Sequence, residues 1–228
     1  MSELGQASAH SGVRYPCPGH YFSREYCSPR RLAAYSYQID EVLKAGPGRV
    51  LEIGPGNGIV SHVLRGAGLL VVTLDLDGRL RPDIVASVLH LPLAQHSFDL
   101  VLCCQVLEHL PFDQFRPVLE QLRRVTRGRV VLSLPDRRRC ITAQVSAPGL
   151  GTRAVLLSLP GLRPRRHVYD GQHFWEIGKR HYSLGRVLQE MQCVGFSVVR
   201  HYRIRENPYQ HVFVLEAEPA SLAVNTNR

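Results

Sequence analysis

The sequence predicts an α/β fold in which a mostly parallel sheet ends in an antiparallel hairpin. Between residues 49 and 218, apolar runs of strand type alternate with segments whose apolar residues recur at helical spacing. A glycine cluster, GPGNG at 54–58, joins the first such strand to a helix that starts at Ile59. The last two strands, 196–204 and 211–218, are joined only by the turn-like ENPYQ.

The other elements are marked by capping residues and by apolar runs. A helix is expected from Pro29 to Gly46, because proline suits a first helical turn and glycine ends a helix. Asp113 is expected to cap a second helix, and Ser183 starts a third that covers 183–194. Five further apolar runs are predicted strands: residues 49–53, 69–75, 83–89, 98–105 and 129–135.

One segment of this single domain is unusually long for a connection. Residues 136–182 far exceed the usual linker of about 2 to 6 residues, so they are expected to form an insert with its own function, a lid over the substrate. The predicted parts of the chain are therefore an N-terminal helical cap (1–48), a ligand-binding core (49–135), this basic insert (136–182), a segment that completes the core (183–218) and a tail (219–228).

The net charge of +9 belongs to the second half of the chain. Residues 1–110 contain 9 basic and 10 acidic residues, whereas 111–228 contain 19 and 9. The excess includes Arg137, Arg138 and Arg139 directly after a predicted strand. Such arginines bind phosphate or carboxylate on a substrate, contact a nucleic-acid backbone, or are simply solvated. The apolar stretch 149–162 nearby leaves contact with an anionic membrane open as well.

Composition excludes several classes of protein. With 44% hydrophobic and 21% charged residues the chain is neither disordered nor fibrous. No apolar run reaches the roughly 20 residues of a membrane span, and the start MSELGQASAHSG lacks the pattern of a secretory signal, so a cytoplasmic location is expected. The six cysteines lack the paired spacing of zinc sites, and we expect no metal.

The glycine cluster is the strongest local signal of a binding site. Glycines between a strand and a helix let a ligand approach the backbone, and the helix start offers unpaired N–H groups, so a nucleotide-like ligand is expected. The dinucleotide fingerprint needs a third glycine where this chain has Ile59, and the Lys-Ser or Lys-Thr pair of a P-loop is absent. Asp75 ends the second strand 21 residues after Gly54, where a carboxylate can accept hydrogen bonds from both ribose hydroxyls, and Asp77 is the competing choice.

Four motifs in a fixed order, VLEIGPGNG, TLDLD, DIVASVLHLP and FDLVLCCQVLEHL, resemble those of the class I S-adenosylmethionine-dependent methyltransferases, in particular their bacterial small-molecule branch. The resemblance covers about residues 49–135 and implies a Rossmann-like three-layer sandwich with a seven-stranded sheet. It also implies S-adenosyl-L-methionine as the cofactor. The residues it assigns to this cofactor are Glu52, Gly54, Pro55, Gly56, Asn57 and Gln105 around the methionine end, Asp75 at the ribose, and Leu76, Ser87 and Val88 at the adenine. The family often has aspartate at position 87, and Ser87 is a weaker acceptor for the adenine amino group.

Two histidines are candidates for catalysis. Methyl transfer from a sulfonium depends on positioning and desolvation, and it needs a base only when the acceptor atom carries a proton. His109 follows the fourth strand at the edge where ligands bind in such sheets, although the LEHL around it is often structural in the family. His173 lies in the insert beside Phe174 and Trp175; these aromatic residues suit a pocket lid, or alternatively they anchor the insert to the core.

The expected function is S-adenosylmethionine-dependent methylation of a small or lipid-like acceptor, anionic acceptors included. Two alternatives are an RNA methyltransferase and a non-catalytic module that binds S-adenosylmethionine. The insert lacks a recognised RNA-binding module and its aromatic residues are gathered in one place, which does not favour RNA. The sequence indicates no particular oligomeric state.

Overall fold

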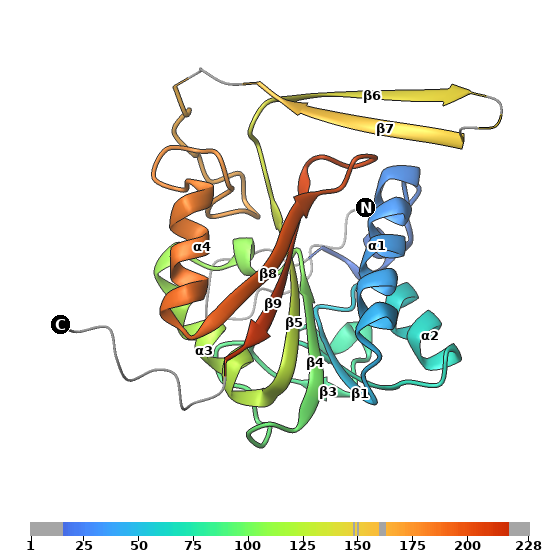
Figure 1. The fold of residues 1–228 in the computed structure, drawn as a ribbon. Coiled ribbons are helices and arrows are strands. Elements are labelled where there is room, and N and C mark those ends of the chain that lie inside the picture. Colours follow the sequence, from blue (N-terminus) through green and yellow to red (C-terminus); the bar gives the residue numbers. More distant parts are fainter. Residues whose placement is uncertain (1–15, 148, 150, 160–162, 219–228) are drawn as a thin grey trace, which may run out of the picture.

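The structure is a computed structural model that describes residues 16–147, 149, 151–159 and 163–218. Seven strands form one sheet in the order β3-β2-β1-β4-β5-β9-β8 (Figure 1). The first five strands are parallel, and β9 runs antiparallel to both of its neighbours. The predicted α/β sandwich with its terminal hairpin is therefore confirmed. The strands of this sheet are β1 (Arg49–Ile53), β2 (Leu70–Asp75), β3 (Ile84–Val85), β4 (Phe98–Cys104), β5 (Thr126–Pro135), β8 (Phe196–Arg203) and β9 (Gln210–Ala217).

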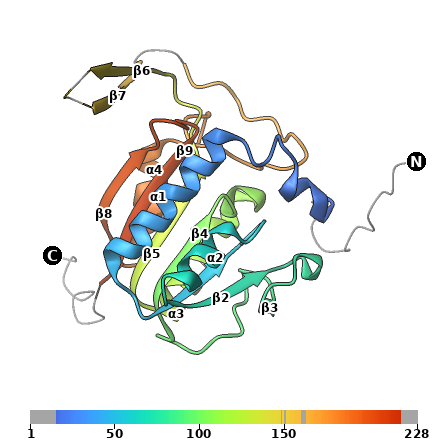
Figure 2. The same cartoon turned by 90° about the vertical axis from the view of Figure 1, so that its right-hand side faces the viewer.

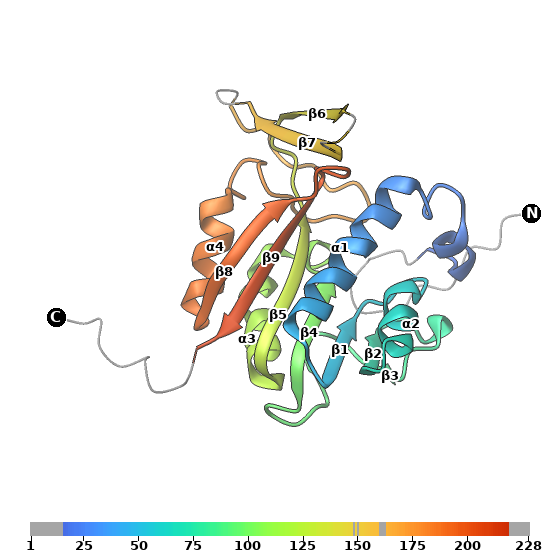
Figure 3. The same cartoon turned by 45° about the vertical axis from the view of Figure 1, so that its right-hand side comes forward.

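Helices cover both faces of the sheet (Figure 3). Alternate residues of each strand face opposite layers, so that in β1 Val50 packs with one pair of helices, whereas Leu51 and Ile53 pack with the other. Burial on both sides explains why these strands are continuous apolar runs in the sequence. The helices are α1 (Pro29–Ala45) and α2 (Ile59–Gly66) on one face, and α3 (Phe115–Val125) and α4 (Leu184–Cys193) on the other. No helix of the described residues is long and apolar enough to cross a bilayer.

Two elements differ from the prediction. The strand predicted over 83–89 contains only Ile84 and Val85, because its one neighbour, β2, ends at Asp75 and the chain then turns, with the N–H of His90 donating to the carbonyl of Ser87. Asp113 does not cap α3. It lies in a 3-10 turn, Phe112–Gln114, which delays the start of the helix to Phe115.

The insert opens with two strands that the sequence analysis did not predict. β6 (Cys140–Ala147) and β7 (Gly151–Ser158) form a separate antiparallel hairpin beyond the end of β5 (Figure 1). Residues 163–182 then return to the sheet without forming a helix or strand. Trp175 is fully buried against Phe112 and Phe115, and its indole N–H donates to the carbonyl of Leu110 at 3.1 Å. Trp175 thus anchors the insert to the core, which is the second of the two roles considered for these aromatic residues.

Asp136 connects the base of the insert to β9. Its fully buried carboxylate accepts hydrogen bonds from Arg138 Nη2 at 2.7 Å and from His211 Nδ1 at 2.8 Å. Burial alone would raise the pKa of Asp136, but these bonds outweigh burial and lower it to about 2. Burial lowers the pKa of His211 in spite of this contact, so His211 is neutral and donates through Nδ1. Arg138 therefore forms a structural ion pair with Asp136.

We expect Asp136→Asn to lower the free energy of unfolding by about 2 kcal/mol at pH 7, measured by urea denaturation, since the charged native carboxylate is stabilised by roughly that amount. Because the native pKa lies below the ordinary value of 3.8, this stabilisation is fully present above about pH 4 and is lost as the pH falls towards 2. Asp40→Asn is the control, since its pair with Lys44 is exposed and contributes about 0.5 kcal/mol at most. A difference between wild type and Asp136→Asn that stayed constant from pH 7 to pH 2 would contradict this account.

Candidate active site

The glycine loop connects β1 to α2 and tolerates no side chain at two positions. Gly54 and Gly56 have φ angles of 72° and 56°. A Cβ on Gly54 would lie 2.4 Å from Val106 Cγ2, and one on Gly56 would lie 3.1 Å from the hydroxyl of Tyr26. The close approach of neighbouring groups and the left-handed backbone together explain the two glycines.

Glu52, at the end of β1, has a buried carboxylate oxygen without a partner. The side chain is nearly buried, and Oε2 makes no hydrogen bond with any residue that the structure describes. Burial raises the pKa of Glu52 to about 7, although Ser61 and Arg65 nearby oppose this rise. A buried oxygen of this kind is unfavourable unless a ligand supplies a donor, and an ammonium group would do so.

At the end of β2, the geometry favours Asp75 over Asp77 as the ligand-binding carboxylate. Both oxygens of Asp77 accept hydrogen bonds from the guanidinium of Arg79, each at 2.8 Å. Asp75 uses Oδ1 to accept the backbone N–H of Asp77 at 2.9 Å, and Oδ2 has no hydrogen bond within the described part of the chain. Burial raises the pKa of Asp75, and the hydrogen bond from the backbone N–H of Asp77 only partly opposes this rise. Asp75 is thus the acid that remains available to a diol.

The turns after β2 and β3 lie together, because the N–H of Ala86 donates to the carbonyl of Asp75 at 3.0 Å. Leu76 is 48% exposed beside this contact, so its apolar side chain is available to a flat ring. Ser87 accepts the N–H of Leu89 through Oγ at 3.3 Å, and Val88 is buried. The three residues expected at an adenine therefore follow neighbouring strand ends.

Gln105 directly follows β4 in a left-handed conformation, with φ of 55°, that residues other than glycine rarely adopt. Its backbone N–H donates to the carbonyl of Ser133 at 2.9 Å, and its side-chain amide donates to Oγ of the same serine at 3.3 Å. Strain of this kind is concentrated at functional sites. Here it fixes Gln105 where β4 ends.

The N-terminal segment covers the glycine loop. Figure 2 shows the chain before α1 extending towards the turn between β2 and β3. The carbonyl of Tyr21 accepts a hydrogen bond from Asn57 Nδ2 at 3.3 Å, and the rings of Tyr21 and Tyr26 pack edge to face at 5.0 Å. Burial raises the pKa of both tyrosines, and the carboxylate of Asp75 adds to the effect. Tyr21 and Tyr26, from the segment before α1, thus lie next to the loop.

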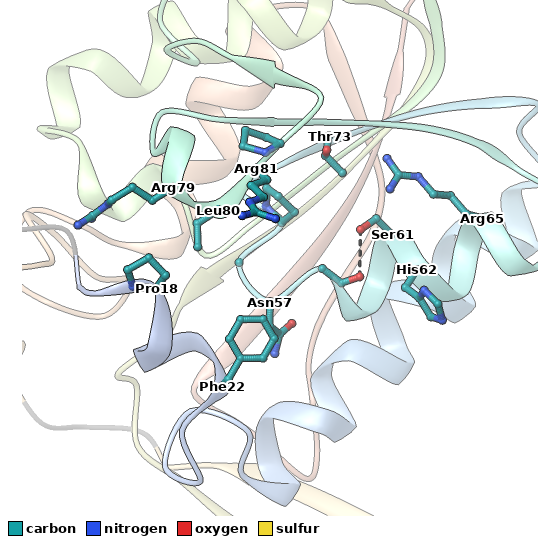
Figure 4. A pocket seen from close by; sticks show the side chains of 14 residues that line it. Pro18, Phe22, Asn57, Ser61, His62, Arg65, Thr73, Arg79, Leu80 and Arg81 are labelled. Carbon is teal, nitrogen blue, oxygen red and sulfur yellow. Dashed lines mark hydrogen bonds between the residues drawn. The ribbon is translucent and has the colours of Figure 1, made fainter.

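A cavity of about 410 Å³ opens beside the same loop (Figure 4). Phe22 and Pro18 of the N-terminal segment lie on one side of it and Arg65 of α2 on another (Figure 4). Pro55, Gly56 and Asn57 line it, whereas Glu52, Asp75 and Gln105 do not. The cavity therefore adjoins the predicted cofactor residues on the α2 side without containing most of them.

Both predicted catalytic histidines lie at the end of β4, together with Glu108. One ligand-type atom from each of Glu108, His109 and His173 lies within 4.8 Å of the others. Glu108 and His109 belong to the 3-10 turn after β4, and the N–H of Phe174 donates to the carbonyl of Glu108 at 2.8 Å, which draws the insert onto this turn. The rings of the two histidines pack edge to face at 5.0 Å. Segments more than 60 residues apart in the sequence thus form one cluster.

Glu176 and Tyr209 orient His173. Glu176 Oε1 lies 3.3 Å from His173 Nδ1 and accepts the hydroxyl of Tyr209 at 2.6 Å. Burial would raise the pKa of Glu176, but the bonds from His173 and Tyr209 and the charge of Arg137 lower it to about 2. Tyr209 lies in the turn between β8 and β9. The sequence predicted this turn, but it did not indicate that Tyr209 contacts Glu176 of the insert.

A parallel sheet with a glycine loop after its first strand and an available acid at the end of its second is the arrangement of a nucleotide-cofactor domain. Residues 51–134 match the family model described as a methyltransferase domain. The matched segment is the part of the chain that resembles the class I S-adenosylmethionine-dependent methyltransferases in sequence, and the fold that this resemblance implied is confirmed.

Solved structures share this fold over most of their length. The PH0226 protein of Pyrococcus horikoshii OT3 has a TM-score of 0.60 and 16% identity, covering 90% of this chain and 96% of its own. A Burkholderia thailandensis 1,6-didemethyltoxoflavin N1-methyltransferase has a TM-score of 0.57 and 14% identity, with coverage of 88% and 84%. The magnesium protoporphyrin IX methyltransferase of Synechocystis PCC 6803 has a TM-score of 0.53 and 16% identity, with coverage of 83% and 79%. A search of curated sequences found no significant match.

The residues of the site fit S-adenosylmethionine, the cofactor of this class. The unpaired oxygen of Glu52 suits the ammonium group of its methionine end. Gly54 and Gly56 leave the space that a ligand needs against the backbone, and Oδ2 of Asp75 is available to a ribose hydroxyl. The glycine loop, Glu52 and Asp75 lie at the carboxyl ends of β1 and β2, which are adjacent parallel strands, so their positions suit one extended ligand.

Proposed function

We propose that this protein is an enzyme that methylates a small acceptor bound against Glu108, His109 and His173. The observation that carries this proposal is that the glycine loop and the histidine cluster follow β1 and β4, which are hydrogen-bonded parallel neighbours. Ligands in open α/β sheets bind at the carboxyl ends of the strands. S-adenosylmethionine, when bound, supplies a methyl group on a positively charged sulfur for in-line transfer to a nucleophilic atom. The cluster is then the part of the chain that faces the acceptor.

In this proposal each group of residues has a distinct role. Glu52 binds the ammonium group of the cofactor and Asp75 binds its ribose, and Tyr21 and Tyr26 exclude water from above the loop. Glu176 holds His173 through Nδ1, which leaves Nε2 directed to the acceptor side. His173 and His109 contact the acceptor, and positioning and desolvation supply most of the rate.

A small acceptor is better supported than RNA. Arg137 pairs with Glu176, and Arg138 pairs with Asp136, so two of the three consecutive arginines after β5 are engaged in internal contacts. A phosphate track needs free cationic groups. Two of the structural neighbours act on small molecules, 1,6-didemethyltoxoflavin and magnesium protoporphyrin IX, which supports the same class of acceptor here. A non-catalytic module would have no use for an unpaired buried acid, such as Glu108, beside two histidines.

We expect the purified protein to bind S-adenosylmethionine in calorimetry, with one cofactor per chain. With a labelled methyl donor and extracts of the source cell, it should release S-adenosylhomocysteine and label a small molecule that organic solvent separates from nucleic acid. Absence of cofactor binding would overturn the cofactor assignment. Cofactor binding with label only in RNA would favour the RNA alternative, and binding without any transfer would favour the non-catalytic module.

A further inference from the structure

Three side chains that are common ligands of transition metals meet at the end of β4, and two observations distinguish them from an accidental cluster. Glu108 is 0% exposed, and neither Oε1 nor Oε2 has a hydrogen-bond partner among the described residues. None of the ion pairs in the described part of the chain involves this carboxylate, whereas the neighbouring Glu176 has several. A buried carboxylate with both oxygens unpaired is strongly unfavourable, and a bound cation would relieve it.

The second observation is the protonation that the surroundings impose on the histidines. Nδ1 of His109 lies 3.0 Å from the carbonyl oxygen of Gln172, which can only accept, so this nitrogen carries the proton. Nδ1 of His173 faces the carboxylate of Glu176 in the same way. In the neutral form of each ring Nε2 is then the lone-pair donor, and no hydrogen bond within the described residues engages either Nε2. Metal-binding histidines are typically held by such carbonyl and carboxylate partners.

From this geometry we infer that Glu108, His109 and His173 bind one divalent transition-metal cation. One ligand-type atom from each side chain lies within 4.8 Å of the other two, and binding of a shared cation would bring these atoms to the metal-ligand distance of about 2.0 to 2.2 Å. Two imidazole nitrogens and one carboxylate oxygen suit Zn²⁺, Fe²⁺ or Co²⁺, whereas Mg²⁺ and Ca²⁺ prefer oxygen ligands. Three protein ligands leave coordination positions open, as in catalytic sites and unlike closed structural ones.

The open positions identify a class of acceptor, and this step rests on the proposed function. A cation bound here would coordinate a hydroxyl oxygen of the acceptor and lower the pKa of that hydroxyl. The hydroxyl proton leaves to solvent, and an oxygen lone pair forms the bond to the methyl carbon. The carbon–sulfur bond breaks and its electron pair stays on sulfur, which yields S-adenosylhomocysteine and a methyl ether. The acceptors of this protein are accordingly hydroxyl compounds.

The test titrates Co²⁺ into chelator-treated protein and follows its visible absorption. We expect one equivalent to bind, with affinity at least about 100-fold lower in His109→Ala and in His173→Ala. His90→Ala is the matched control, because His90 is exposed on another part of the chain, and its affinity should equal that of wild type. His173→Gln, which keeps the size of the side chain better, should lose affinity as well, and circular dichroism verifies that each variant is folded.

The outcomes separate this inference from the proposed function. Equal Co²⁺ binding by wild type and both histidine variants, or no saturable binding, would overturn the metal site. If Co²⁺ binds but release of S-adenosylhomocysteine with hydroxyl acceptors is unaffected by chelator, the role in acceptor binding is wrong. Calorimetry with S-adenosylmethionine is performed on the same metal-free proteins, and failure there would overturn the cofactor assignment while leaving the Co²⁺ result to stand alone.

Discussion

Gly56→Arg is expected to abolish binding of S-adenosylmethionine, with an affinity at least about 100-fold lower than that of wild type. A Cβ at this position would already lie 3.1 Å from the Tyr26 hydroxyl and 3.4 Å from the Tyr21 ring, so the longer arginine side chain must enter the space above the loop. The φ of 56° adds strain for any residue except glycine. Calorimetry on the folded variant measures the loss.

Gly185→Arg is the matched control for this substitution. Gly185 is exposed near the start of α4, a Cβ there meets nothing within 4 Å, and its φ lies outside the left-handed range. The control adds the same charge and should bind the cofactor as wild type does. If Gly56→Arg also bound normally while folded, the cofactor would have to occupy a different place, and the cavity beside α2 would become the first alternative.

The fold could be predicted from the sequence because its signals are local. Strands buried on both faces, such as β4, are continuous apolar runs, and α4 is bounded by Ser183, whose hydroxyl accepts the N–H of Arg186, and by Gly195 in a left-handed conformation. The strand predicted over 83–89 is too long because strand length depends on a non-local partner. An apolar run does not reveal how long its neighbour is, and pairing with β2 ends after two residues.

The cofactor end and the proposed acceptor end of the site also differ in how local their sequence signals are. Glu52 and the glycine loop are consecutive in the chain, so their chemistry is visible in one short motif. The proposed acceptor end combines a turn after β4, the insert and the turn at Tyr209, and only the fold brings these together. The expectation of no metal relied on cysteine spacing. It did not consider histidines that are more than 60 residues apart, such as His109 and His173.

Glu108→Gln is expected to lower turnover at least about 100-fold and at the same time to stabilise the chelator-treated protein by about 1 to 3 kcal/mol. The native carboxylate is fully buried, and both of its oxygens lack partners, so a neutral amide of the same shape is easier to bury. The release of S-adenosylhomocysteine measures turnover, and urea denaturation at pH 8 measures stability. A gain in stability with a loss of activity is typical of a group retained for function.

Glu176→Gln is the matched comparison, because Glu176 is also a buried glutamate of this cluster but its carboxylate has partners. The substitution weakens its contacts with His173, Tyr209 and Arg137, so both stability and turnover should fall. The two isosteric changes are therefore expected to shift the free energy of unfolding in opposite directions. If Glu108→Gln destabilised the protein as Glu176→Gln does, the Glu108 carboxylate would be a structural group with partners in solution, and neither an acceptor contact nor a metal ligand would be needed to explain its burial.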